Sequence, residues 1–344
     1  MRKTSSTSGS RHGNFIRSVA FLAGLVLLLG VSQFALFPRH DRDELWREYV
    51  GLPHGSLDVL FLGSSLVHAN VNPTVLWGAT GIRAYCLSGS EQSLPTTRSY
   101  LREALRTQEP KVVVLDLHMF SLDNASLSEN QKRSNFTMMP LGIGKVEAVA
   151  EGSPAQEWTR YFIPLEQFHT RWDEVSRMDF NPYKWRYKSD NLFLGYRVVK
   201  RVEPQQLSFE RRALDERLYT QNHHVVSEII ELAEQADAKV LLIVGPSSRV
   251  SLHDDWTGRL RQELAIGYPD VGILETQLHT VDMGVDRTRD YYDQWHLNAR
   301  GAEKYSVWIG TQIAEMYGLP RERSSQLDDV WRTELARYRA LHGD

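Results

Sequence analysis

Ser65, Asp293 and His296 are residues of the types that together turn a serine hydroxyl into a nucleophile. A serine attacks an ester only when a base takes its proton, a carboxylate orients that base and backbone N–H groups bind the oxyanion. Asp293 and His296 are three positions apart in a loop, so one turn can present both side chains to the same site. This pattern predicts acyl chemistry through a covalent acyl-serine.

The serine lies at a break in an apolar segment. The sequence Gly63-Ser64-Ser65 follows the apolar run 57–62, and Gly63 permits a tight turn there. Ser65 would begin the next helix with a free backbone N–H, and ligands of open parallel sheets bind at the carboxyl ends of strands. By itself this turn also fits a simple helix cap, and an Asp and a His three apart also occur by chance. Their joint occurrence favours a nucleophile.

The elements that would position these residues alternate between strands and helices. Apolar runs rich in β-branched residues predict interior strands at 57–62, 112–117 and 240–244. Between and after them, apolar periodicity predicts helices at 96–108, 224–236 and 299–317, with a further amphipathic helix in the tail after residue 326. This alternation implies right-handed crossovers and a parallel sheet. The predicted fold is a three-layer α/β domain.

The N-terminal segment predicts a membrane anchor. Nineteen residues from Ser18 to Leu36 carry no charge, close to the roughly 20 needed to cross a bilayer as a helix. The alternative is a cleaved signal peptide, which would have a shorter apolar region and a small-x-small cleavage site. Basic residues precede the segment, so the positive-inside rule places the N-terminus in the cytoplasm and residues 40–344 outside. We therefore expect a single-pass protein of the cell membrane.

The stretch between residues 124 and 220 interrupts the strand and helix pattern. Eleven aromatic residues lie between Trp158 and Tyr196, far above the 10% average of the chain. One interpretation is an inserted subdomain whose aromatics form its own core. The other is a sugar-stacking or membrane-facing wall beside the active site. Both can hold for different residues.

Composition excludes several other classes. The net charge is −3, and without the four basic residues of the first seventeen positions the remaining 36 basic and 43 acidic side chains give −7. We expect no nucleic-acid partner because no basic stripe is available to neutralise phosphates. The one cysteine, Cys86, cannot form an internal disulfide and is expected in the core. His223, His224 and His253 lack carboxylates or cysteines at zinc spacing, so no metal and no cofactor is predicted.

Two sequence blocks resemble those of the SGNH hydrolase superfamily, which contains the GDSL-like esterases and acyltransferases. "FLGSSLVHANVNP" at 61–73 resembles its first block and "DQWHLNARGAEKYS" at 293–306 its last. The G-S-S form is similar to that of membrane-anchored bacterial members, among them the D-alanyl transfer protein of teichoic acid modification. The resemblance implies a flavodoxin-like αβα sandwich in which Ser65 is the nucleophile, His296 the base and Asp293 its orienter.

The same resemblance implies an oxyanion hole made by Ser65, Gly89 and His118. The second block of the family supplies a glycine N–H, and "CLSGSEQS" offers Gly89, although another register would place Glu91 there. The third block normally supplies an asparagine, which "VVVLDLHMFS" lacks. His118 lies near that position and can donate a hydrogen bond, while Asp116 or the backbone are alternatives.

These observations lead to one expected organisation. It has a cytoplasmic tail at 1–17, a transmembrane anchor at 18–37, a linker at 38–56, a catalytic domain at 57–123 and 221–318, an insertion at 124–220 and a helical tail at 319–344. The expected function is a serine esterase or O-acyltransferase acting on acetyl or other acyl esters of cell-envelope polysaccharide, alongside a membrane-bound O-acyltransferase. The alternative is a non-catalytic glycan-binding or assembly protein with this fold.

Overall fold

The structure is a computed structural model of the 344-residue chain. It describes residues 8–37, 43–121, 123, 128–137, 139–181, 188–211, 215–252, 256–320 and 326–343. Contacts divide the chain into two compact units. Unit 1 comprises Met1–Asp41 and Thr159–Tyr187, and unit 2 comprises Arg42–Trp158 and Lys188–Asp344.

Unit 2 is built on a five-stranded parallel sheet with the strand order β2-β1-β3-β7-β9. Its strands are β1 Val59–Gly63, β2 Ala84–Ser88, β3 Val112–Asp116, β7 Lys239–Ile243 and β9 Gly272–Leu274. Every residue of β1, β2 and β3 is buried, as expected of parallel strands covered on both faces. The three strands predicted from apolar runs are confirmed, and β2 and β9 complete the sheet.

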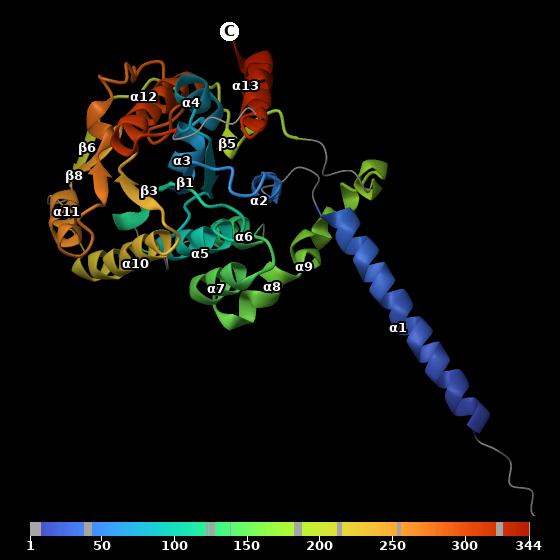
Figure 1. Cartoon of the computed structure of the whole chain (residues 1–344). Coiled ribbons are helices and arrows are strands. Elements are labelled where there is room, and N and C mark those ends of the chain that lie inside the picture. The colour runs from blue at the N-terminus through green and yellow to red at the C-terminus, as the bar shows by residue number, and fades with distance from the viewer. Residues whose placement is uncertain are drawn as a thin grey trace, which may run out of the picture. The chain divides into compact units, whose positions relative to one another are not determined.

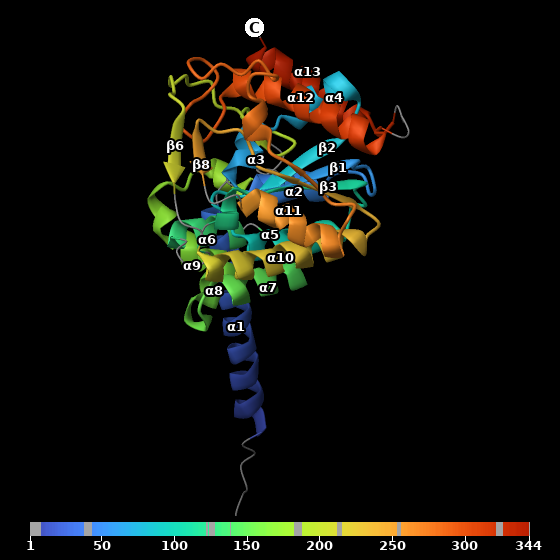
Figure 2. The same ribbon diagram turned by 90° about the vertical axis from the view of Figure 1, so that its left-hand side faces the viewer.

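Helices cover both faces of this sheet and give a three-layer αβα sandwich, as Figures 1 and 2 show. In both views α5 and α10 lie along one face, and α3, α4 and α12 along the other. The helices of unit 2 are α2 Asp43–Val50, α3 Ser65–Asn70, α4 Pro73–Thr80, α5 Leu94–Ala104, α6 Glu129–Phe136, α7 Ile143–Gly152, α10 Glu216–Glu234, α11 Trp256–Gly267, α12 Ala299–Tyr317 and α13 Asp329–His342. The predicted α/β domain is therefore observed.

Two small sheets lie outside the main one. Strands β4 Leu192–Phe193 and β5 Tyr196–Arg197 form an antiparallel hairpin, and β6 Ser208–Arg211 pairs with β8 Arg249–Leu252 in parallel. The sequence analysis predicted neither sheet, since strands of two to four residues carry too little periodicity to be recognised.

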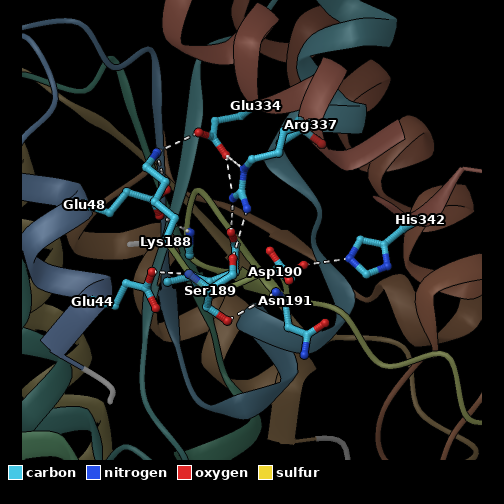
Figure 3. A network of polar contacts seen from close by, with 12 residues as sticks. Glu44, Glu48, Lys188, Ser189, Asp190, Asn191, Glu334, Arg337 and His342 are labelled. Carbon is cyan, nitrogen blue, oxygen red and sulfur yellow. Dashed lines mark hydrogen bonds and ion pairs between the residues drawn. The ribbon is translucent and has the colours of Figure 1, made fainter. Parts of the chain in front are cut away.

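A polar network attaches the C-terminal helix α13 to the rest of unit 2 (Figure 3). Glu334 accepts hydrogen bonds from Lys188 at 2.7 Å and from Arg337, one turn further along the helix, at 2.7 Å. Arg337 also donates to the carbonyl of Ser189 at 2.9 Å, and Lys188 lies 3.6 Å from Glu48 of α2. The tail is thus part of the folded unit and joins three segments that are distant in sequence.

Unit 1 contains the N-terminal apolar helix. Helix α1 spans Ser8–Leu36, and its segment Gly13–Leu36 has a mean hydropathy of 2.3. This segment is long and apolar enough to cross a membrane, and it is the one such helix in the part of the chain that the structure describes. A signal sequence near the N-terminus can also meet this criterion of length and composition.

The second segment of unit 1 packs on the C-terminal end of α1. It contains most of α8 Trp158–Phe162, with α9 Pro164–Phe168 and the 3₁₀ helices His169–Asp173 and Arg177–Phe180. The rings of Phe37 and Phe168 lie 5.4 Å apart edge to face, and Arg171 Nη1 donates to the carbonyl of Leu36 at 2.5 Å. That bond satisfies one of the carbonyls that a helix leaves open at its end.

The aromatic residues between 158 and 196 behave in two ways. Tyr161 and Phe168 are buried, whereas Trp172 is 75% exposed and Phe180 53% exposed. The buried residues agree with the interpretation of a separate core, and the exposed residues agree with the interpretation of a stacking or membrane-facing wall. Contacts place 159–187 of the predicted insertion in unit 1 and its flanks in unit 2, and the predicted domain boundaries stay a prediction.

Candidate active site

The turn after the central strand β1 places Ser65. Gly63 ends the strand with a φ of +147°, and Ser64 then precedes Ser65, the first residue of α3. A Cβ on Gly63 would lie 2.9 Å from Cβ of Asp116, in addition to the strain of that φ in any other residue. The turn therefore needs glycine, and it leaves the backbone N–H of Ser65 without an intrahelical acceptor.

Ser65, His296 and Asp293 lie in one hydrogen-bonded chain. The Oγ atom of Ser65 is 2.8 Å from Nε2 of His296, and Nδ1 of that imidazole is 2.9 Å from each carboxylate oxygen of Asp293. The two ring nitrogens thus face different partners, which fixes the ring orientation. This is the arrangement in which a base can take the serine proton while a carboxylate orients it.

Asp293 is held as a carboxylate. Its Oδ1 accepts backbone N–H groups of Trp295 at 2.8 Å and of His296 at 2.9 Å. Burial raises the pKa of Asp293, but the hydrogen bond and charge of His296 and the two backbone donors together hold that pKa below its usual value. The carboxylate is therefore ionised at neutral pH and can orient the imidazole of His296.

Asn70, at the C-terminal end of α3, holds the segment 290–298 that carries Asp293 and His296. We call this segment the catalytic loop because it carries these candidate residues. The side-chain oxygen of Asn70 accepts the N–H of Leu297 at 2.8 Å, and its amide nitrogen donates to the carbonyl of Pro246 at 3.2 Å. Asn298 then caps α12 by accepting the N–H of Gly301 at 3.1 Å. The helix that begins with Ser65 thus also positions the residue after His296.

Tyr292 supports the imidazole from its flat side, a feature that the sequence analysis missed. The rings of Tyr292 and His296 are parallel within 4°, with centroids 5.2 Å apart. Arg201 lies over the ring of Tyr292, with its guanidinium carbon 5.8 Å from the ring centroid, and it donates to the carbonyl of Tyr292 at 2.8 Å. Nothing in the sequence around Arg201 signals this contact.

His118 lies beside the triad. Its imidazole packs edge to face on Trp295 at 5.2 Å between centroids, and Arg249 covers Trp295 at 5.2 Å. Burial and, to a lesser extent, the electrostatic influence of the neighbouring His296 imidazole lower the pKa of His118 to about 4. The ring is therefore neutral at physiological pH and carries one N–H donor.

Asp116 is the last residue of β3 and lies at the same edge of the sheet as His118. Its two oxygens accept the backbone N–H groups of His118 and Gly245, each at 3.0 Å. Burial raises the pKa of Asp116 to about 6, although both hydrogen bonds oppose that shift. Both oxygens of the carboxyl group are thus bonded to backbone donors, and the choice between His118, Asp116 and the backbone for the oxyanion stays a prediction.

Gly89 follows β2, the neighbour of β1, in which Ser88 is in register with Gly63. A Cβ on Gly89 would lie 1.6 Å from Oδ1 of Asn135, so a larger residue would require the Asn135 side chain to move. The role of its N–H in an oxyanion hole stays a prediction. Ser88 also lies 3.2 Å from Nδ1 of His68, which places His68 on the same side of the sheet.

The remaining candidates are accounted for by structural contacts. His223 lies 3.6 Å from Glu263, and His224 lies 3.8 Å from Glu228. His253 lies outside the described residues, and those residues contain no cluster of three potential metal ligands. Cys86 is buried, and burial raises the pKa of its thiol well above the usual value, so it is not a nucleophile.

Comparison with known proteins gives few matches. No family model and no curated protein matches the chain. One solved structure that it matches is the crystal structure of a proposed acylhydrolase from Bacteroides fragilis, with a TM-score of 0.37 and 12% sequence identity. The match covers 79% of this chain and 94% of that one. The roles of the site residues therefore depend on their own geometry.

Proposed function

We propose that the protein is a membrane-anchored, extracytoplasmic serine esterase or O-acyltransferase of the SGNH type. The observation that carries the proposal is the continuous chain from Ser65 Oγ to His296 at 2.8 Å and from His296 to Asp293 at 2.9 Å. A serine at a strand-to-helix turn with this pair of partners supports nucleophilic catalysis and has no evident structural purpose.

In the proposed mechanism, His296 removes the proton of Ser65 as its oxygen attacks the ester carbonyl carbon. The tetrahedral intermediate collapses when His296 returns that proton to the departing alcohol, which leaves an acyl-serine. Water or a glycan hydroxyl then attacks the acyl carbon, again losing its proton to His296, and Ser65 is regenerated. Hydrolysis and transfer share these steps and differ only in the acceptor.

The developing oxyanion needs donors that are already in place. The backbone N–H of Ser65, at the start of α3, is one. The neutral ring of His118 is a second, since its side chain lies against Trp295 of the catalytic loop. In this proposal His118 takes the part that an asparagine plays in most of the superfamily.

The N-terminal unit supports a location at the cell envelope. Helix α1 would span the membrane, and the apolar side chains packed around its C-terminal end would lie in the interface. Four of these are exposed to solvent by between 46% and 75%: Ile163, Trp172, Met178 and Phe180. Tryptophan and other apolar residues at this depth bind the headgroup region favourably. Acetyl or other acyl esters of envelope polysaccharide are therefore the proposed substrates, and a membrane-bound O-acyltransferase is the proposed acyl supplier.

A fluorophosphonate probe tests the nucleophile, because it labels only an activated hydroxyl. Wild type should gain one adduct by intact mass, and Ser65→Ala should gain none. Ser64→Ala is the matched control, since that neighbouring hydroxyl is buried and has no hydrogen-bond partner among the described residues. A folded wild-type protein that stays unlabelled would favour a non-catalytic glycan-binding module instead.

A further inference from the structure

A second concave site lies between α4, α12 and α13 in unit 2. It is a groove of about 890 Å³, and Figures 1 and 2 both show these three helices side by side. A volume of this size holds several sugar residues, since pockets of ~300–1,000 Å³ enclose drug-sized ligands. None of the triad residues lines it.

The groove carries an excess of positive charge. Lys200, Arg289 and Arg339 line it, and among the residues that the structure describes no carboxylate lies within 4.0 Å of any of these three cations. Arg300 lines it as well and pairs with Asp290 at 3.1 Å. This concentration occurs in a chain whose net charge is −3, so it is a local feature.

Among the residues that the structure describes, Glu303 is the one acid that lines the groove, and it bonds to a residue of the same wall. Its carboxylate accepts the hydroxyl of Tyr338 at 2.7 Å. Apolar side chains, among them Val75, Val202 and Leu335, form part of the remaining surface, together with Asn298 and His342. Apolar walls with guanidinium groups among them suit a sugar ring that bears an anionic group, because arginine binds carboxylates and phosphates in bidentate geometry.

The segment 199–203 lies between the groove and the triad. Its backbone is bonded to the catalytic loop at both ends, since Val199 accepts the N–H of Ala299 at 2.8 Å and the N–H of Glu203 donates to Tyr291 at 2.9 Å. Lys200 and Val202 line the groove. Arg201 between them lies over Tyr292, and Tyr292 stacks on His296. One extended segment thus separates a cationic groove from the catalytic base.

We propose that this groove binds an acidic glycan chain whose repeating units carry carboxylate or phosphate groups. For its catalytic consequence the proposal rests on the function above: a chain held beside the segment 199–203 would present the ester or hydroxyl that reacts at Ser65. The binding itself depends only on the groove.

The test measures binding of soluble polymers to the full chain in detergent at about 50 mM salt. Polygalacturonate supplies carboxylates, a glycerol phosphate polymer supplies phosphodiesters, and neutral dextran is the uncharged reference. Arg289→Gln/Arg339→Gln is the groove variant. Arg217→Gln/Arg261→Gln removes the same charge from exposed positions on α10 and α11, outside the groove.

We expect one of the acidic polymers to bind and dextran to bind much more weakly. The groove variant should lose roughly tenfold in affinity, with a smaller salt dependence, because two exposed ion pairs are removed. The α10–α11 variant should bind like wild type. Equal affinity for dextran, or an equal loss in both double variants, would overturn the proposal.

Ser65→Ala separates this proposal from the proposed function. Polymer binding by Ser65→Ala should match wild type, whether or not the serine proves to be a nucleophile. If wild type acylates with a small activated ester but binds no acidic polymer, the groove proposal fails and the triad stands. If it binds the polymer but Ser65 never reacts with the probe, the groove stands and the proposed function fails.

Discussion

Two polar clusters of unit 2 each contain a hydrogen-bonded carboxylate but differ in the groups that surround it. In the triad, His296 has a side chain 15% exposed and Asp293 one 31% exposed. This hydrogen-bonded chain ends at the hydroxyl of Ser65, whose partner is the imidazole of His296 that would deprotonate it. In the α13 network of Figure 3, Glu334 is only 4% exposed and is bound by Lys188 and Arg337.

The α13 network ends on backbone carbonyl groups, whereas the triad ends on a side-chain hydroxyl. Arg337 directs its remaining donors to the backbone carbonyls of Ser189 and Leu192 and packs over Phe193 at 3.9 Å. Burial raises the pKa of Glu48, an effect that Lys188 opposes and Glu334 reinforces. A charged cluster that ends on backbone groups stabilises the fold, whereas in the proposed function the cluster that ends on the half-buried hydroxyl of Ser65 reacts with substrate.

The largest expected effect separates chemistry from stability. Ser65→Ala should lower kcat/KM for a small activated acetyl ester by roughly 10⁴-fold or more, because no other group of the triad can accept the acyl group. The free energy of unfolding in urea should change by less than about 0.5 kcal/mol. If the variant kept its esterase activity, Ser65 would not be the nucleophile.

Arg337→Ala should show the reverse behaviour. Removing the guanidinium leaves Glu334 buried with Lys188 as its remaining cation, which should lower the free energy of unfolding by about 3–5 kcal/mol. Lys188→Met is the milder control: its side chain is 49% exposed, and about 1 kcal/mol is expected. Both variants should keep wild-type turnover per folded molecule at low temperature. A fall in kcat without a loss of stability would break the distinction between the two clusters.

His118→Phe tests the edge of the triad. If the neutral ring donates to the oxyanion, kcat should fall by roughly 10²–10³-fold with little change in KM. Because the pKa of His118 is lowered to about 4, its ring carries no charge above about pH 5, and the remaining activity should keep the wild-type pH profile there. A loss confined to stability would assign His118 to packing against Trp295.

The smallest expected effect concerns Asp116, which lies at the end of β3 near the candidate site and affects the stability of the fold. Its folded pKa of about 6 exceeds the usual value of 3.8, so the protonated form stabilises the fold, and this contribution disappears as pH rises through about 6. We expect wild type to lose about 1 kcal/mol from this group between pH 5 and pH 7 in urea titrations. Asp116→Asn should lack that part. Asp293, whose pKa is lowered, stays ionised over the same interval and adds no slope.

Local pattern was sufficient for the elements that position the proposed nucleophile. Strands β1, β3 and β7 are rich in β-branched and leucine residues. Helix α12 has its predicted bounds because Asn298 caps its start and Gly318 ends it. Strand β9 was missed because three residues, Gly272–Leu274, carry no periodicity. The G-S-S turn and the Asp and His three apart are likewise short-range signals.

Contacts between distant segments could not be predicted in this way. The support of His296 by Tyr292 and Arg201 depends on the segment 199–203 lying against the catalytic loop. The pair of Lys188 and Glu334 joins residues 146 positions apart. Each is a product of tertiary packing between residues that look like ordinary surface charges in the sequence.

The hydrogen bond between Ser65 and His296 spans 231 positions of the chain. During synthesis, which proceeds from the N-terminus, the serine appears long before its base. Until residue 296 has followed and the sheet has closed, Ser65 is an ordinary alcohol. In the proposed mechanism, reactivity therefore arrives together with the finished fold, and a nascent or truncated chain would consume no acyl groups.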